Sequence, residues 1–222
     1  VVALQGLLLE KAEHVMVKLS PMLDISKALE ELNHVKEVHV VAVANECKEL
    51  DFVLERDYHG EVHFTCVNLL TPQPEVRFTL DEERNCQCQI ASGVSKYLYE
   101  PNPALMKAGC FKLLTKRYNV FKLHKNSNLY TSEQLLSDFP GRIFEVEDWA
   151  SYNKKVKQTL LLDVKKASIA VRNFPITVAE LRKALKISDG DAIFLFATTL
   201  KGEEKVIIRT KKPPFEKRFL LD

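Results

Sequence analysis

Apolar residues in the first third of the chain form two kinds of pattern. In one they recur at the spacing of a helix, and in the other they follow one another without interruption. Residues 2–12 place Leu4, Leu7 and Leu8 at helical spacing, which predicts an amphipathic helix with these leucines turned inward. Continuous apolar runs over residues 14–19 and 38–44 predict buried strands, and Asp24 can cap a helix between them. The order strand, helix, strand is typical of the crossover unit of a doubly wound sheet.

The next segments alternate apolar and polar residues. Residues 50–55 and 62–69 show this alternation and are separated by turn residues at 57–60. They therefore predict an antiparallel pair at the edge of the sheet. Two prolines within residues 71–74 then indicate a linker, so the first α/β segment is expected to cover residues 1–72.

Polar residues stand where the predicted strands end. Because ligands of open α/β sheets bind beyond the carboxyl ends of the strands, four of them are candidates for lining a pocket, although each is equally explained as a turn or cap residue: Lys18, Ser20, Asp24 and Asn45. No nucleophile, general base or cluster of metal ligands converges in the sequence. We predict no catalytic residue and no metal site.

The middle of the chain, residues 73–148, mixes short strands with a helix. Strands are predicted at 76–80, 86–90, 97–99, 120–124, 129–130 and 142–146. Asn102 stands at an N-cap position and Pro103 at the first helical position, so a helix begins there, with an inward stripe of Leu105, Ala108, Phe111 and Leu114. This order predicts a compact α+β sandwich.

The last part, residues 149–222, predicts a second small α+β domain. A helix is expected over 149–162 and strands over 167–171, 193–197 and 206–208, the last two as a hairpin across residues 201–202. Thr177 and Glu180 form a capping box, and Ile176 and Leu181 can close a hydrophobic staple. The helix that starts there should bury Val178 and Ala184 and end near residues 189–190.

Charge is unevenly distributed along the chain, although the whole carries only +2. Residues 1–95 have a net charge of −8, residues 96–132 of +6, residues 133–150 of −4 and residues 151–222 of +8. An acidic beginning and a basic end in one chain indicate a polyanionic partner at the basic end.

Several long phrases carry a family resemblance: YLYEPNPALMKAG, KLHKNSNLYTS, DFPGRIFEV, ASIAVRNFPITVAELRKALKI and DGDAIFLFATTL. Over nearly its whole length the chain resembles the C-terminal two-thirds of bacterial class I S-adenosylmethionine-dependent methyltransferases with a ferredoxin-like domain and a terminal THUMP-like domain. The resemblance implies a fold that is α/β and then α+β: a partial Rossmann-type methyltransferase sheet (1–72), a ferredoxin-like domain (73–148) and a THUMP-like domain (149–222).

The resemblance also implies a function. The family's glycine-rich cofactor loop and catalytic strand end lie upstream of Val1, so we expect a fragment that binds no cofactor and is inactive alone, and that S-adenosylmethionine serves the full-length parent. THUMP domains are associated with tRNA, which implies tRNA or rRNA as the substrate and RNA recognition as the role of the fragment.

The residues expected to bind RNA are mostly basic. Arg172 and Asn173 lie at a strand-to-helix junction, where backbone N–H groups favour an anion, although Asn173 is equally explained as a turn residue. Other cations of the last domain, including Arg209 and Lys211, and five aromatic residues that could stack on bases, Tyr97, Tyr99, Tyr118, Phe121 and Phe174, support the idea. The main candidates are Lys107, Lys112, Lys116, Arg117, Lys125, Arg172, Asn173, Arg182, Lys183 and Lys186.

A second interpretation is a non-enzymatic interaction module, whose basic faces dock on the acidic head of the same molecule or on a protein partner. Five scattered cysteines indicate reduced thiols and a cytoplasmic location. No apolar run approaches the roughly 20 residues that cross a bilayer, so no membrane partner is expected.

Overall fold

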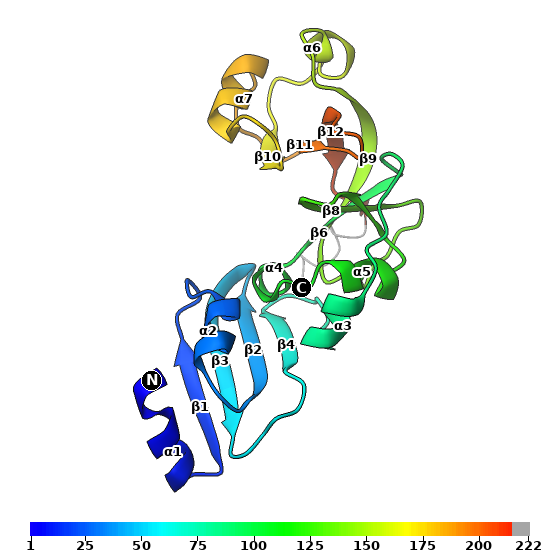
Figure 1. Cartoon of the computed structure of the whole chain (residues 1–222). Coiled ribbons are helices and arrows are strands. Elements are labelled where there is room, and N and C mark those ends of the chain that lie inside the picture. Colours follow the sequence, from blue (N-terminus) through cyan, green and yellow to red (C-terminus); the bar gives the residue numbers. More distant parts are fainter. Residues whose placement is uncertain (215–222) are drawn as a thin grey trace. The chain divides into compact units, whose positions relative to one another are not determined.

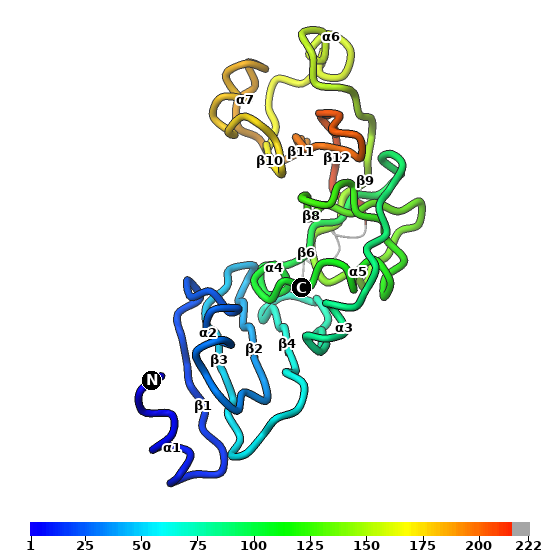
Figure 2. Tube along the Cα trace, in the orientation of Figure 1, coloured from blue at the N-terminus to red at the C-terminus, as the bar shows by residue number. Residues whose placement is uncertain are grey.

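The computed structural model describes residues 1–214 and divides the chain into two compact units. The first unit contains residues 1–87 and 101–114, and the second contains residues 88–100 and those from 115 onward. The chain passes from one unit to the other three times. Its path can be followed by colour in Figures 1 and 2.

The first unit is built on a five-stranded sheet with the strand order β1-β3-β2-β4-β5. Strands β2 and β4 are parallel, and every other neighbouring pair is antiparallel. Helix α4 packs against the central strands and α1 against β1. The strands are β1 (His14–Leu19), β2 (Val35–Val43), β3 (Glu46–Glu55), β4 (His63–Leu69) and β5 (Val76–Thr79), and the helices are α1 (Gln5–Lys11) after a 3₁₀ turn (Val2–Leu4), α2 (Ile25–Glu31), α3 (Leu80–Asn85) and α4 (Pro103–Ala108).

Strand pairing in this sheet differs from the prediction. The antiparallel pair expected between residues 50–55 and 62–69 does not form, because β2 lies between β3 and β4. Ala44 and Asn45 both have positive φ (48° and 67°), as a two-residue hairpin turn requires, so β3 folds back directly onto β2. β3 also separates β1 from β2, so the predicted crossover unit has an antiparallel strand inserted into it.

Helix α1 forms where it was expected but turns its other face inward. Leu4 and Leu7 are each 55% exposed and Leu8 is 40% exposed, whereas Gln5 and Leu9 are buried. The side chain of Gln5 donates to the carbonyl oxygen of Glu31 (3.1 Å) and accepts from the amide of Asn33 (2.8 Å), which fixes the orientation of the helix. The leucine face therefore remains uncovered.

The helix predicted from Pro103 is confirmed at its start and wrong in its length. Asn102 accepts a hydrogen bond from the amide of Leu105 (3.0 Å), and Pro103 is the first helical residue. Gly109 has a left-handed φ of 76°, which ends α4. The next helix, α5 (Lys112–Arg117), begins on its own cap, because the Glu83 carboxylate accepts from the first two amides of α5, those of residues 112 and 113.

Glu83 lies on α3, a helix that the sequence analysis did not predict. The signal was present, since Thr79 and Glu82 form a capping box at its start. After α3 the chain is irregular, so the strand expected over residues 86–90 is absent apart from one bridge of Ile90 to Lys122.

The second unit is built on a seven-stranded sheet in the order β10-β11-β12-β9-β6-β8-β7. β10 and β11 are parallel, while β11, β12 and β9 are antiparallel to one another in turn. Both faces of β11 and β12 are buried, so apolar cores form on either side of the sheet. Its elements are β6 (Tyr97–Pro101), β7 (Phe121–His124), β8 (Ser127–Ser132), β9 (Gly141–Ser151), α6 (Val156–Thr159), β10 (Ser168–Arg172), α7 (Val178–Leu185), β11 (Phe194–Thr199) and β12 (Lys205–Lys211).

The helix predicted over 149–162 is wrong, because β9 pairs with β12 as far as Ser151 and leaves only the short α6 behind it. The α7 capping box is confirmed: Thr177 and Glu180 exchange both of its hydrogen bonds. Val178 and Ala184 are exposed rather than buried, and α7 ends at Leu185, because Lys186 takes a left-handed conformation (φ 53°).

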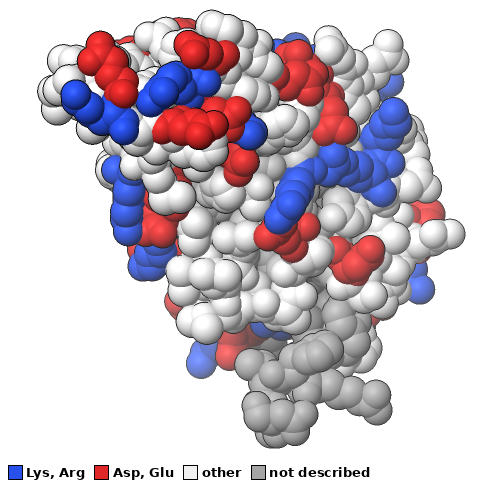
Figure 3. All heavy atoms as spheres, turned by 90° about the horizontal axis from the view of Figure 1, so that it is seen from below, with Lys and Arg blue, Asp and Glu red and all other residues white. Residues whose placement is uncertain are grey.

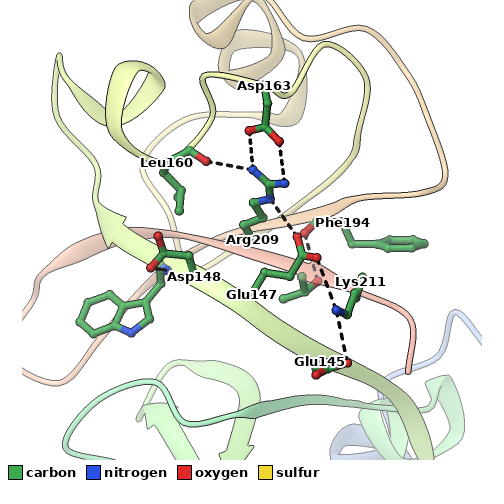
Figure 4. Close-up of polar contacts among 10 residues, drawn as sticks. Glu145, Glu147, Asp148, Leu160, Asp163, Phe194, Arg209 and Lys211 are labelled. Carbon is green, nitrogen blue, oxygen red and sulfur yellow. Dashed lines mark hydrogen bonds and ion pairs between the residues drawn. The ribbon is translucent and has the colours of Figure 1, made fainter. Parts of the chain in front are cut away.

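An ion network holds β9, β12 and the segment after α6 together (Figure 4). Arg209 donates from Nε to Glu147 (2.9 Å), and from Nη1 and Nη2 to Asp163 (2.6 and 2.9 Å). Its Nη1 also contacts the carbonyl oxygen of Leu160 (3.4 Å). Hydrogen bonding to Arg209 lowers the pKa of Asp163 and raises that of the guanidinium. This arginine therefore serves the fold.

Substituting Gly190 should destabilise the second unit. A Cβ atom at this position would lie 2.8 Å from Cβ of Lys166 and 3.2 Å from its carbonyl carbon, so the backbone itself must shift. Gly190→Ala is expected to lower the free energy of unfolding by about 1–3 kcal/mol, measured by urea denaturation. Gly93→Ala, whose Cβ would meet nothing within 4 Å, is the matched control, and equal stability of the two variants would contradict the packing argument.

Replacing Arg209 should remove an acid-sensitive part of the stability. The pKa of Asp163 is lowered in the folded state, so its contribution is present above its unfolded pKa and is lost as the pH falls through the folded pKa. Arg209→Gln should therefore lower Tm most near neutral pH, and the gap to the wild type should narrow as the pH falls below about 4. A gap in Tm that does not change between pH 7 and pH 3 would argue against this role.

Candidate nucleic-acid interface

A buried carboxylate shared by two arginines is the most distinctive polar feature of the second unit. The side chain of Glu100 is 7% exposed. Its Oε1 accepts from Nε of Arg172 (2.7 Å), and its Oε2 accepts from Nε (2.9 Å) and Nη2 of Arg142. A carboxylate at this depth needs such partners, because the desolvation penalty of a buried, unpaired ion is on the order of several kcal/mol. Two guanidinium groups against one carboxylate leave the cluster with a net positive charge.

The fold brings this cluster together from three strands that are distant in sequence. Glu100 lies near the end of β6, Arg142 near the start of β9 and Arg172 at the end of β10. β10 is the edge strand and is separated from β6 by three other strands, yet it packs against β8. The amide of Lys201 donates to the carbonyl oxygen of Leu123 (3.0 Å), so the end of β11 also reaches β7. The sheet therefore curls until its edge meets its other half.

A second polar group lies beside the end of β10. The imidazole of His124 is buried, and its Nδ1 accepts from the amide of Asn126 (3.1 Å) and lies 2.9 Å from Nδ2 of Asn173. Because a backbone amide can only donate, the neutral ring carries its proton on Nε2 and donates it to Glu203 (3.0 Å). This hydrogen bond lowers the pKa of Glu203. Asn173 has a φ of 53°, which asparagine tolerates better than most residues.

The predicted RNA-binding residues of α7 lie apart from Arg172. Arg182 donates to the carbonyl oxygens of Ala167 (3.4 Å) and Ile187 (3.5 Å) and to Asp189 (2.9 Å). Ala167 precedes β10 and Arg172 ends it, so the two ends are about 17 Å apart at the usual rise of a strand. Lys183 is exposed on the same helix, and Lys186 is exposed directly after it. The structure therefore does not gather Arg172 and the α7 cations into one cluster.

The other candidates are divided between the units. Lys116 and Arg117 are exposed at the end of α5, and Lys125 is exposed directly after His124. Lys112 belongs to the first unit and donates from Nζ to the carbonyl oxygen of Arg84 (2.6 Å). Lys107 also belongs to the first unit, where it is half-buried.

Lys107 lines a cavity of about 810 Å³ in the first unit, together with Asp24, His34, Tyr58, His59 and Arg84. Of the four residues predicted to line a pocket, Asp24 is at this cavity, where it also caps α2 by accepting from the amides of Ser26 and Lys27. The other three lie elsewhere. Lys18 pairs with Glu49, Ser20 accepts from the amide of Met22, and Asn45 forms the hairpin turn and bonds Asn68.

The aromatic candidates are mainly structural. Tyr99 is fully buried, and the ring of Phe174 packs on Tyr152 with centroids 5.1 Å apart. Tyr97 and Tyr118 are half-buried, whereas Phe121 is 40% exposed. Phe121 is thus the one of these five rings that is open enough to stack on an unpaired base.

Charges of both signs are mixed at the surface. Figure 3 shows one face, on which Lys and Arg side chains lie among Asp and Glu side chains. Arg209 and Lys211, expected to be part of a basic exterior, are held by Glu145, Glu147 and Asp163 instead. Charge counted along the sequence therefore overestimates the positive potential of the last domain.

Four members of the site are not among the residues predicted from the sequence: Glu100, Arg142, His124 and Glu203. A signal existed for two of them, because Glu100 is the only acid between residues 96 and 132, and Arg142 is the only Lys or Arg between residues 133 and 150. A lone charge of opposite sign inside a charged stretch is a reason to look for its partner. No such signal marked His124 or Glu203, whose contact depends on the fold.

Within residues 1–214 no three His, Cys, Asp or Glu side chains are grouped so that they could hold a metal ion. Among the same residues there is no helix of the length and apolarity needed to span a membrane.

Comparisons with known proteins agree with this architecture. Residues 97–140 match a family model described as a ferredoxin-like domain, and residues 141–212 match one described as THUMP domain-like. The structure superposes on a crystal structure from Porphyromonas gingivalis W83, described as a "putative methyltransferase", with a TM-score of 0.88 and 39% sequence identity. The match covers 95% of this chain and 54% of that protein, so the chain spans about half of its length.

No curated protein matches the sequence. The predicted fold class, α/β followed by ferredoxin-like and THUMP-like α+β parts, is confirmed by the sheets, the two domain matches and the structural neighbour. The domain ranges 1–72, 73–148 and 149–222 stay a prediction.

Proposed function

We propose that this chain is the C-terminal part of a class I, S-adenosylmethionine-dependent methyltransferase that modifies tRNA or rRNA, and that these residues supply RNA recognition. The observation that carries the proposal is the match to the Porphyromonas gingivalis protein over 95% of this chain. The THUMP-like match of residues 141–212 supports RNA as the substrate. A cytoplasmic, bacterial setting belongs to the same proposal.

The first unit has a surface that suits a longer sheet. Among residues 1–214, strand β1 is an edge strand that pairs only with β3, so one row of its main-chain groups is left for a further strand. Beside it, Leu4, Leu7 and Leu8 of α1 are exposed, and Met16 of β1 is 70% exposed. An apolar surface next to an unpaired edge supports the proposal that the remaining part of the parent packs there.

Methyl transfer is proposed for the parent and not for these residues. The two glycines with positive φ among residues 1–214, Gly109 and Gly202, end a helix and close the β11–β12 hairpin. In the described part of the chain no glycine-rich loop joins a strand to a helix, so these residues do not fit a cofactor site of the Rossmann type. No chemical step is therefore assigned to them.

A second candidate function is a non-enzymatic module that docks on a protein partner. The observation that favours it is the pairing of cations within the chain, as in Arg182 with Asp189 and Arg209 with Asp163. Such pairing reduces the positive potential available to RNA.

Titration of the 222-residue chain separates these functions. We expect tRNA to bind at low salt and to be released as salt rises, because phosphate contacts displace counterions, with a log–log slope of about −0.7 to −0.9 per contact. S-adenosylmethionine should not bind, because no glycine-rich loop joins a strand to a helix among residues 1–214. Fluorescence anisotropy and calorimetry measure the two ligands.

Tight binding of S-adenosylmethionine to this chain would contradict the division of labour. Indifference to tRNA at low salt would remove RNA recognition and favour the interaction module. An acidic polypeptide of similar charge is the control ligand, because a surface that binds any polyanion would bind it equally well.

A further inference from the structure

We propose that Arg142 and Arg172, braced by the buried carboxylate of Glu100, form a two-armed site for a phosphodiester group of RNA. The inference rests on the proposed function and assigns the phosphate contact to one place in the second unit. Among the ten residues predicted to bind RNA, it selects Arg172 and adds Arg142 as its partner.

The two arginines retain hydrogen-bond donors that the fold does not use. Arg172 bonds Glu100 through Nε and the carbonyl oxygen of Val171 through Nη1 (2.8 Å), and Arg142 bonds Glu100 through Nε and Nη2. Within residues 1–214, Nη2 of Arg172 and Nη1 of Arg142 therefore have no protein partner. Both groups bond the same carboxylate, so these remaining donors belong to neighbouring guanidinium planes.

Exposure separates these arginines from the purely structural ones. The side chains of Arg142 and Arg172 are 46% and 39% exposed, although the carboxylate between them is 7% exposed. Arg209, whose Nε, Nη1 and Nη2 all bond acidic side chains, is 19% exposed. Arg142 and Arg172 are thus anchored at the inner side and open to solvent at the outer side.

The anchor prepares the site for a bidentate ligand. The unused terminal nitrogen of each arginine can donate to one of two phosphate oxygens, and fixing both guanidinium groups in advance reduces the entropy lost on binding. Arg142 is held further by Phe144, with its guanidinium carbon 5.6 Å from the ring centroid. The net positive charge of the cluster remains available, because one carboxylate cannot neutralise two guanidinium groups.

Glu100→Gln gives the sharpest test, because an effect of net charge and an effect of arginine positioning would change the RNA affinity in opposite directions. Removing a negative charge should tighten RNA binding if only net charge matters. If Glu100 positions the arms, the variant should bind tRNA about tenfold more weakly, which corresponds to about 1.4 kcal/mol. Anisotropy titrations of the full chain at low salt, with circular dichroism to confirm folding, measure the effect.

Two substitutions in the Arg209 network are the matched controls. Asp163→Asn also removes a carboxylate from an arginine pair, and Arg209→Lys also replaces a paired arginine, but neither touches the proposed site. Both should leave tRNA affinity within about twofold of the wild type, although Tm falls. Arg172→Lys, which keeps a positive charge opposite Glu100 but loses the planar group that can bond Glu100 and a phosphate at the same time, should weaken binding as Glu100→Gln does.

The outcomes separate the two claims. If the wild type binds tRNA and both Glu100→Gln and Arg172→Lys bind it equally well, the two-armed site is wrong and the proposed function stands. If the wild type binds no tRNA, both fail. Should Glu100→Gln not fold, Arg172→Lys decides alone. Perturbation of the ¹H–¹⁵N Nε signals of Arg142 and Arg172, and not of Arg209, by inorganic phosphate would support the site.

Discussion

The charge of Glu100 is the constraint on which the second unit depends. A carboxylate this deeply buried is tolerated only while cations stay beside it. Its two partners, Arg142 on β9 and Arg172 on β10, follow Glu100 by 42 and 72 residues. The carboxylate is therefore satisfied only after the sheet has curled and brought its edge strand to β6. The polar cluster therefore exists only in the completed fold.

Features that depend on a few consecutive residues could be predicted from the sequence. The caps at Asp24, Asn102 and Thr177 are confirmed, because each needs only a side chain and the amides of the next turn. The hairpin across residues 201–202 is confirmed for the same reason. A local cap does not fix length, however, and the helix from Pro103 ends early because Gly109 adopts a left-handed conformation and Glu83 caps a new helix.

Features that depend on distant partners could not be predicted. The leucine stripe of α1 has helical spacing, but Gln5 bonds the chain around Glu31 and Asn33 and turns the leucines outward. The pairing of β4 with β2 instead of β3 follows from a two-residue turn at Ala44 and Asn45, and neither residue signals strand order. The same limit applies to the candidate site, since counting cations along the chain does not reveal which of them meet a carboxylate.

The arginines of the second unit differ in how many hydrogen-bond donors their contacts within the protein leave unused. Arg209 donates its hydrogen bonds to Glu147 and Asp163. Arg182 donates to two backbone carbonyl groups and to Asp189. Arg142 is positioned by Glu100, and Arg172 by Glu100 and the carbonyl oxygen of Val171, and each keeps one terminal nitrogen without a protein partner among residues 1–214. Recognition of a phosphate is favoured by hydrogen-bond donors that are held in place and not yet used. A mobile lysine side chain loses more conformational entropy on binding, and an arginine whose donors all bond the protein has none left for a ligand. The proposed phosphate contact therefore depends on the geometry around Glu100 more than on net charge.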